Sequence, residues 1–504
     1  MTALTVHSLI ESQAAQRPQA IYALSTEGGS PLRYAELARG CRSVAAVLRQ
    51  HGARRGDTVS LVMPNGLQTL RVLLGAMHAG LCVNPVNLLS QPEQMRYVLA
   101  HSDCRLVCVA PEWEARVRAM LADLDRAVAL LVVAPDASAL PGESEAPAIA
   151  EAPPPSPEDP ALLMYTSGTT GMPKGVMLSQ RSLAANANAI SAEHGLGPDD
   201  RVLAVLPLYH INAFAVTMLA PLAHGGSLAM PPKFSAGRFW EQAAQAQCSW
   251  INVVPTMISY LLEGGKPPAA QTAGIRFCRS ASAALPPEHH RAFEQMFGIG
   301  IVETMGLTET AAPSFSNPMD PAKRKLGSVG RASGCEARVI DAQLSEVPDG
   351  TTGQLAIRGP NVMLGYYKNE EATRASFTPD GWLRTGDLGH RDADGFFFVT
   401  GRIKELIIKG GENIAPREID EALLAHPDVR DAAAVGVPDR HYGQEIGVCV
   451  ILREGSTCTE EALRAYCAGA LGRYKAPGHY RFVEELPRGP SGKVQRLKLL
   501  PLFE

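Results

Sequence analysis

At 504 residues, the chain is long enough to form one large domain and a second, smaller one. Hydrophobic residues make up 46% of it and charged residues 19%, which is an ordinary globular balance. The net charge of −4 argues against a general nucleic-acid binder, because such proteins are usually strongly basic.

The cysteines and the N-terminus suggest the setting in which the protein works. Ten cysteines are scattered without a C-x-x-C pair, which favours neither a zinc site nor a disulfide framework. We expect Cys104 and Cys108 to pack in a strand. No basic segment followed by an apolar core opens the chain, and no apolar run reaches membrane-spanning length. We therefore expect a cytoplasmic setting, with no nucleic-acid partner and no integral membrane segment.

Helical and strand patterns alternate in the first hundred residues. The spacing of apolar residues predicts a helix over 34–51, and the run Val59–Met63 predicts a strand that ends at a Pro-Asn-Gly turn. Such alternation indicates a mixed α/β core. Residues 134–160 are rich in Pro, Ala, Glu and Ser, which is typical of a surface linker.

A loop of glycines and hydroxyls follows the linker. The apolar run 161–164 predicts a buried strand, and the segment 165–175 reads YTSGTTGMPKG. Glycines let a backbone approach closely, amides and hydroxyls donate hydrogen bonds, and a lysine adds positive charge, so the segment suits a nucleotide triphosphate. It is not the G-x-x-x-x-G-K-[ST] loop of ordinary kinases and ATPases, because Lys174 lies between Pro173 and Gly175. The candidate nucleotide-binding residues here are Thr166, Ser167, Gly168, Thr169, Thr170, Gly171 and Lys174.

This segment resembles the phosphate loop of the AMP-forming acyl-adenylate superfamily, which comprises acyl-CoA and aryl-CoA ligases, carrier-protein adenylation domains and luciferases. The resemblance implies an α/β fold with a large N-terminal domain of β-sheets flanked by helices and a small mobile α+β C-terminal domain. We expect residues 1–402 to bind AMP and the acyl group, and residues 403–504 to carry the lysine of adenylation. In the smaller part, the pattern predicts helices over 414–425 and 459–470, and strands over 431–437 and 447–453.

Two further motifs resemble nucleotide-contacting segments of the superfamily. Members carry an aromatic-Gly-x-Thr-Glu motif, and this chain has Met305, Gly306, Thr308 and Glu309 in its place. The resemblance implies that Thr308 contacts a phosphate and that Glu309 helps to hold Mg²⁺, an ion that prefers oxygen ligands. In the segment WLRTGDL, at 382–388, the resemblance implies that Asp387 binds the ribose, and Arg402 is similar to an arginine that contacts the ribose or a phosphate.

Three lysines of the C-terminal part match functional positions of the superfamily. Lys404 falls on the hinge about which the small domain rotates between half-reactions. Lys409, with Gly410 and Gly411, resembles the loop that lines the pantetheine tunnel. Lys493 corresponds to the catalytic lysine of adenylation, whose role is to stabilise the negative charge of the transition state.

The remaining candidate residues border the acyl group. His210 resembles a gate between the nucleotide and acyl pockets, and Ser282 and Ala283 lie in a turn that resembles the border of the adenine and acyl pockets. The catalytic set that the resemblance implies is therefore Lys493, Glu309, Thr166 and His210.

The resemblance implies an acid–CoA ligase that uses ATP, Mg²⁺ and coenzyme A. A carboxylic acid and ATP would give acyl-AMP and pyrophosphate, and the CoA thiol would then displace AMP. Family geometry puts apolar side chains in the wall of the acyl pocket, so a fatty or aromatic acid is the expected substrate. These side chains are Phe214, Met305, Leu307, Ala312 and Phe315.

Alternatives stay open at this point. Ala476 and Gly478 stand where some CoA ligases have basic residues, which suits an adenylation enzyme that loads a separate carrier protein. Arg279 lies in a segment similar to oxalate–CoA ligases and could pair with a second carboxylate. A luciferase-like oxygenase and a non-catalytic binding protein are further alternative functions. A homodimer is kept as a further partner.

Overall fold

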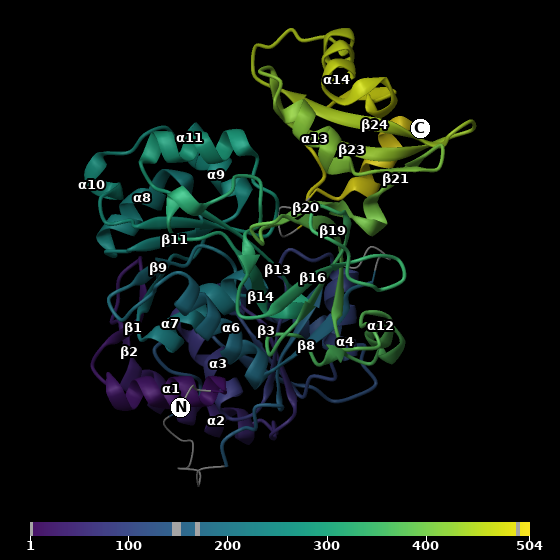
Figure 1. The fold of residues 1–504 in the computed structure, drawn as a ribbon. Coiled ribbons are helices and arrows are strands. Elements are labelled where there is room, and N and C mark those ends of the chain that lie inside the picture. The colour runs from purple at the N-terminus through teal and green to yellow at the C-terminus, as the bar shows by residue number, and fades with distance from the viewer. Residues whose placement is uncertain (1–3, 144–152, 167–171, 490–493) are drawn as a thin grey trace.

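The computed structural model of the protein describes residues 4–143, 153–166, 172–489 and 494–504. Figure 1 shows a large N-terminal part with a smaller C-terminal part on one side of it, next to β19 and β20. This architecture confirms the expected fold class of a large α/β domain and a small α+β domain. The boundary expected between residues 402 and 403 stays a prediction.

Two large sheets dominate the N-terminal part of the described chain. The first has seven strands in the order β18-β8-β7-β4-β3-β5-β6, and the second has nine in the order β15-β14-β13-β12-β11-β9-β10-β1-β2. The strands of the first sheet are β3 Thr58–Val62, β4 Cys82–Pro85, β5 Leu106–Val109, β6 Ala129–Val132, β7 Pro160–Thr166, β8 Lys174–Ser179 and β18 Gly365–Tyr366. Those of the second are β1 Ile21–Ser25, β2 Leu32–Arg33, β9 Arg201–Leu203, β10 Ser227–Met230, β11 Trp250–Val253, β12 Phe277–Ser280, β13 Ile301–Leu307, β14 Ala312–Ser316 and β15 Arg331–Ala332.

Helices fill the space between these two sheets. The helix α3 contacts β4 of the first sheet and β1 of the second, and α6 contacts β7 and β8 on one side and β14 on the other. Because both of its sides face protein, α3 has almost no polar face and is buried nearly throughout. The helices of the N-terminal part are α1 Val6–Gln16, α2 Tyr34–Gln50, α3 Leu67–His78, α4 Pro92–His101, α5 Glu114–Ala122, α6 Gln180–Glu193, α7 Ala220–His224, α8 Ala236–Gln245, α9 Pro255–Glu263, α10 Ala269–Thr272, α11 Pro287–Phe297 and α12 Glu370–Ala375.

Within the described residues, two smaller sheets follow along the chain. One has the order β16-β17-β19-β20, and the other joins β22, β21, β24, β23 and β25 in the C-terminal part. Their strands are β16 Glu336–Ile340, β17 Gly353–Arg358, β19 Leu383–Arg391, β20 Phe397–Arg402, β21 Ile407–Lys409, β22 Glu412–Ile414, β23 Val429–Asp439, β24 Gly443–Leu452 and β25 His479–Phe482. The helices α13 Pro416–Leu424 and α14 Glu460–Lys475 contact each other in the same part.

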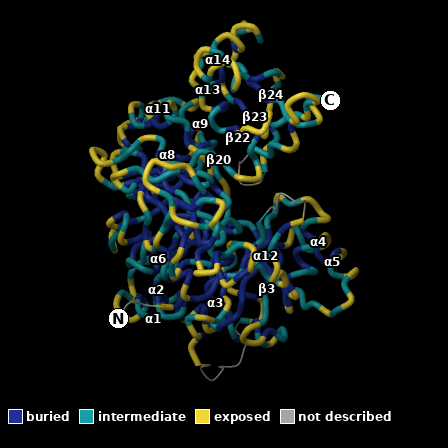
Figure 2. Tube along the Cα trace, turned by 45° about the vertical axis from the view of Figure 1, so that its right-hand side comes forward, coloured by how far each residue is buried: buried dark blue, intermediate teal, exposed yellow. Residues whose placement is uncertain are grey.

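Hydrophobic packing is separate in the two parts. One cluster of buried side chains runs from Val6 to Leu383, and another runs from Ile407 to Tyr480. Figure 2 shows buried segments inside each part and exposed segments around them. The C-terminal part therefore has a core of its own, as a separate folding unit requires.

Most local predictions for the chain agree with the structure. The predicted helix 34–51 is α2, and the predicted strand 59–63 is β3. Cys108 lies in β5 and Cys104 is buried just before that strand. No helix in the described ranges combines the length and the apolar character needed to cross a bilayer. The cytoplasmic setting stays a prediction.

The carboxyl ends of the strands place the candidate site. In the second sheet, β9, β11, β12 and β13 run parallel to one another, so their carboxyl ends lie at the same edge. Ligands of open α/β sheets bind beyond such an edge. The turn at Ser282 follows β12, and the loop that carries His210 follows β9.

An enclosed ion pair anchors α13 in the C-terminal part. Arg496 Nη2 lies 2.5 Å from Asp420 Oδ2, while Asp420 Oδ1 accepts a hydrogen bond of 2.7 Å from the backbone N–H of Ala434. Both side chains are largely buried. Removing one partner would therefore leave an uncompensated charge in the core.

We expect Asp420→Ala to destabilise the C-terminal part by about 3 kcal/mol, because the buried Arg496 would lose its shorter ion pair and keep only that with Glu405, at 3.3 Å. Hydrogen exchange of the backbone amides of α13 and β23 measures this loss locally. Glu460→Ala is the matched control, since Glu460 pairs with Arg464 on the surface of α14. Equal exchange in the two variants would contradict the prediction.

Candidate functional site

The predicted phosphate loop connects two antiparallel strands. Thr166 is the last residue of β7, Lys174 is the first of β8, and the two are paired across the strands. Ser167, Gly168, Thr169, Thr170 and Gly171 lie outside the described residues. The hairpin nevertheless fixes both ends of the loop at the carboxyl end of β7.

Tyr366 connects the lysine of this hairpin to Glu309. Lys174 Nζ lies 4.9 Å from the centre of the Tyr366 ring, a distance that suits a cation–π interaction. The Tyr366 hydroxyl donates a hydrogen bond of 2.8 Å to Glu309 Oε1. Sequence reasoning did not give Tyr366 a role, although it follows the conspicuous segment GPNVMLG.

Close backbone packing shapes the segment that carries Glu309. Thr308 and Glu309 belong to η4, Thr308–Thr310, directly after β13. A Cβ atom at Gly306 would lie only 2.6 Å from the Ala312 carbonyl carbon, so this position requires glycine. Met305 is half-buried at the aromatic position of the motif and packs beside a hydrophobic cluster.

The predicted ribose residue is paired with the predicted arginine. Asp387 on β19 and Arg402 on β20 face each other across the two strands. Arg402 Nε donates a hydrogen bond of 2.6 Å to Asp387 Oδ1, and Asp387 is only 5% exposed. Burial lowers the pKa of Arg402, but the charge and hydrogen bond of Asp387 outweigh it and raise the pKa, and the charges of Glu405 and Glu309 add to this rise.

His210 stands immediately before an unusual helix. The residues that follow it form the π-helix Asn212–Leu219, which is fully buried. A π-helix is rare and is found frequently at functional sites. The His210 ring lies edge-on to that of Tyr209, with the ring centres 4.8 Å apart.

The turn after β12 holds Ser282 in a strained conformation. Its φ angle is +78°, which is uncommon for a residue other than glycine. Ala283 is exposed at this turn. The Ser282 hydroxyl accepts a hydrogen bond of 3.1 Å from Asn212 Nδ2, so the turn and the π-helix are joined directly.

The apolar wall expected for the acyl pocket is only partly available to a substrate. Phe214 and Phe315 have no exposed surface, because both pack inside hydrophobic clusters. Ala312 is also buried. Met305 and Leu307 are half-buried.

A polar cluster lies next to the turn at Ser282. Arg279 on β12 is 1% exposed, and its Nη1 donates hydrogen bonds of 2.7 Å to Asn212 Oδ1 and to Asn252 Oδ1. The two asparagines were not identified from the sequence. Asn212 lies far from Arg279 in the chain, and the packing of the π-helix brings the two side chains together.

The lysine of the predicted tunnel loop points into the protein. Lys409 is 6% exposed, and its Nζ lies 2.6 Å from Glu445 Oε1 and 2.9 Å from the Tyr474 carbonyl oxygen. Gly410 has a φ of +55° and lies near the Tyr474 hydroxyl and the Tyr442 ring, while Gly411 has a φ of +88°. The glycines, rather than the ammonium group, are therefore the accessible part of this loop.

The other two lysines of the C-terminal part are Lys404 and Lys493. Lys404 lies exposed in the short helix Ile403–Glu405, directly after β20. Lys493 falls outside the described residues. Its neighbours Arg488 and Val494 pair as an antiparallel bridge.

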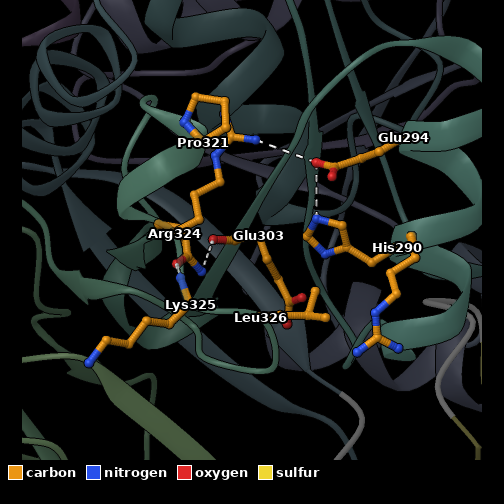
Figure 3. Close-up of a pocket in the computed structure, with 9 residues that line it drawn as sticks. His290, Glu294, Glu303, Pro321, Arg324, Lys325 and Leu326 are labelled. Carbon is orange, nitrogen blue, oxygen red and sulfur yellow. Dashed lines mark hydrogen bonds and ion pairs between the residues drawn. The ribbon is translucent and has the colours of Figure 1, made fainter.

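A separate cavity of about 190 Å³ surrounds Glu303, which comes from β13. Figure 3 shows the Glu303 side chain directed toward Leu326, with His290 and Arg324 on either side. None of the described candidate site residues lines this cavity. Glu303 is 4% exposed, and burial raises the pKa of its carboxyl from 4.5 to about 8, although Arg417 opposes this rise.

Comparison with known proteins agrees with the sequence motifs. Residues 10–367 match the family described as AMP-binding enzyme, and residues 418–493 match the AMP-binding enzyme C-terminal domain. A protein named sulfoacetate–CoA ligase from Cupriavidus necator is 59% identical over 497 residues, which cover 98% of this chain and 97% of that protein. A protein named oxalate–CoA ligase from Arabidopsis thaliana is 35% identical over 98% of this chain and 97% of its own length.

The fold resembles a solved structure with bound nucleotide. The crystal structure of ATP-bound MatB from Rhodopseudomonas palustris superposes with a TM-score of 0.92 at 30% identity, and 99% of each chain is covered. The similarity therefore extends over both parts of the molecule.

We expect Tyr366→Phe to slow ATP–pyrophosphate exchange about tenfold, because Glu309 loses a hydrogen bond to its charged carboxylate. Tyr367→Phe is the matched control, since the neighbouring hydroxyl donates to Asp103 instead, over 2.8 Å. An equal loss in both variants would contradict a specific role for Tyr366.

The raised pKa of Glu303 predicts a pH-dependent stability. The native state keeps a proton that the unfolded chain releases above about pH 4.5, so this contribution is full below that pH and is lost as the pH rises through about 8. We expect the unfolding free energy of the wild type to fall by at most about 1.4 kcal/mol per pH unit in this window. Urea unfolding of Glu303→Gln should lack this fall.

The control for that measurement is Glu288→Gln, on the exposed side of α11. It should retain the pH dependence of the wild type. A Glu303→Gln profile that stays parallel to the wild-type profile would show that Glu303 does not titrate in this window.

Proposed function

We propose that this chain, which belongs to the family of AMP-binding enzymes and is an AMP-forming CoA ligase, acts on a small carboxylic acid that carries a second anionic group. Sulfoacetate is the first candidate, because a relative with 59% identity over nearly the whole chain is named for that acid. The 35% identical relative is named for oxalate, which also has two acidic groups. This proposal replaces the fatty or aromatic acid expected from the sequence.

The observation that carries the proposed chemistry is the convergence of five side chains on one nucleotide site. Lys174, Tyr366 and Glu309 are linked in series, and the charge of Glu309 reaches Arg402, which is paired with Asp387. They come from two different sheets and the short helix after β13. Such an arrangement suits the phosphates at one end and the ribose at the other.

In the first half-reaction, the substrate carboxylate attacks the α-phosphate of ATP and pyrophosphate leaves. No general base is required, because a carboxylic acid with a pKa of about 4 is already ionised at neutral pH. Thr166 and Lys174 would bind the phosphates, and Asp387 would accept hydrogen bonds from the ribose hydroxyls. Lys493 would stabilise the charge that accumulates at the α-phosphate in the transition state.

The site also suits Mg²⁺. Glu309 offers carboxylate oxygens, and the Tyr366 hydroxyl orients one of them. Magnesium is commonly held by one or two carboxylates together with substrate phosphates and water. Glu309 would hold the ion, which would neutralise part of the phosphate charge.

In the second half-reaction, the CoA thiol attacks the acyl carbon and AMP leaves. Gly410 and Gly411 would line the path of the pantetheine arm, since neither carries a side chain that obstructs it. Lys409 would hold the loop in place through Glu445. The thiol, with a reference pKa of about 8.5, needs only modest help to react as a thiolate.

A second candidate acceptor is a carrier protein loaded in trans. Lys475 lies near the segment where some CoA ligases bind the CoA phosphates, but its Nζ is 2.7 Å and 2.8 Å from the two carboxylate oxygens of Glu418. That pairing leaves Lys475 less available for a phosphate. The homodimer stays a prediction.

Incubation with sulfoacetate and ATP, and either CoA or a pantetheinylated carrier protein, tests the proposal. We expect a CoA thioester together with equimolar AMP and pyrophosphate. A thioester on the carrier protein alone would replace CoA as the acceptor. Release of ADP and phosphate would exclude the adenylate route.

We expect Lys493→Ala to slow adenylate formation at least about 100-fold, because the transition state loses a positioned positive charge. Conversion of supplied acyl-AMP to thioester should continue at nearly the wild-type rate. Lys498→Ala is the control, since this lysine is exposed five residues later. Loss of both half-reactions in Lys493→Ala would contradict the assigned role.

A further inference from the structure

We infer that Arg279 binds the second anionic group of the acid, a sulfonate or a carboxylate, and that Asn212 and Asn252 position its guanidinium group. This inference rests on the proposed function and identifies the residue that selects the substrate. It assigns a binding role to a side chain that lies outside the nucleotide site.

Three elements converge on Arg279. It lies on β12, and its neighbour Asn252 comes from the adjacent parallel strand β11, with the two residues directly paired. Asn212 is the first residue of the π-helix that follows His210. The cluster thus lies at the carboxyl ends of the strands, beside the turn that the sequence assigns to the border of the acyl pocket.

The hydrogen bonds orient the guanidinium group without neutralising it. Nη1 donates to both asparagine side-chain oxygens, and Asn252 Nδ2 in turn donates to Asn212 Oδ1 over 3.3 Å. Asn212 then donates to Ser282, so the cluster extends to the strained turn. Both amides are uncharged, and they leave the positive charge of Arg279 uncompensated.

A donor of the same group is left without a partner. Arg279 Nε is buried and makes no hydrogen bond with any residue that the structure describes. A buried N–H group that is not hydrogen-bonded costs free energy. An oxygen atom of a bound anion would satisfy it, and Arg is suited to bind two oxygens of one anion at once.

No carboxylate in the described ranges pairs with this arginine. Apart from burial, the group that affects the pKa of Arg279 is the Cys278 thiol, and no carboxylate of the described residues does so. Arg279 in turn acts on His194, whose pKa is lowered first by burial and then by the charge of Arg279. Burial lowers the pKa of Arg279 to about 9, so the group is still positively charged at neutral pH. The site therefore lacks one negative charge.

A purely structural role would not need a charge. A buried cation without a partner is strongly unfavourable, and an apolar side chain of similar volume would fill the same space without that cost. Retention of an arginine here is accounted for when the substrate supplies the missing negative charge. The acid would then place its carboxylate at the nucleotide and its second anion at Arg279.

The test compares acids that differ only at the distal group. Sulfoacetate and malonate each place an anion one methylene from the carboxylate, whereas 3,3-dimethylbutanoate has an uncharged group of similar shape to a sulfonate. For Arg279→Met, we expect kcat/KM to fall at least about 100-fold with sulfoacetate and malonate. With 3,3-dimethylbutanoate it should stay equal or rise.

Two further variants serve as controls for Arg279→Met. Arg276→Met is the matched control, because Arg276 lies three residues earlier, is exposed and pairs with Asp200. It should keep the wild-type preference. Arg279→Lys keeps the charge but not the planar fork, so KM for both dianions should rise while kcat with 3,3-dimethylbutanoate is unchanged. This variant serves if Arg279→Met does not fold.

The outcomes separate the two proposals. If the wild type forms no thioester with any of these acids, the proposed substrate class fails. If it does, but Arg279→Met keeps the same preference, or loses activity equally with charged and uncharged acids, Arg279 does not bind the second anion. A loss with sulfoacetate alone would limit the site to sulfonates.

Discussion

A positive charge enclosed at the carboxyl end of β12 constrains this site more than any other interaction. Arg279 is almost fully buried, and only neutral amides accept hydrogen bonds from its Nη1. Those amides come from the adjacent strand and from the start of the π-helix, so Arg279 joins the two elements. We propose that this charge, rather than an apolar wall, selects the acid.

The residues proposed to bind the nucleotide differ from Arg279, because their opposite charges are paired with each other. Asp387 and Arg402 lie on adjacent strands and form an ion pair before any ligand arrives. Tyr366, at the edge of the seven-stranded sheet, reaches Glu309 after β13 of the nine-stranded sheet. Preorganised groups of this kind lower the cost of reorganisation when charge moves during the reaction. The C-terminal part lies next to β19 and β20, the two strands that carry this pair (Figure 1).

Local patterns were sufficient to predict much of this arrangement. Lys174, Glu309, Asp387 and Arg402 stand in short motifs that resemble those of the acyl-adenylate superfamily. The mixed α/β core followed from the alternation of helices and strands, and the arrangement of a large and a small domain followed from the resemblance. Asn212 and Asn252 could not be predicted, because they meet Arg279 only in the folded chain, Asn252 through strand pairing and Asn212 through the packing of the π-helix. Lys409 shows another limit. The resemblance placed it with Gly410 and Gly411 in the loop that lines the pantetheine tunnel, but it did not predict that the Lys409 side chain is buried against Glu445.

The central claim, that a buried cation selects the acid, is tested most directly by competition. Wild-type protein is given ATP, CoA and equal concentrations of sulfoacetate and 3,3-dimethylbutanoate, and the ratio of the two thioesters is measured by mass spectrometry. The account predicts that sulfoacetyl-CoA exceeds the other product by at least about 100-fold. Equal amounts, or an excess of the thioester of the uncharged acid, would contradict it.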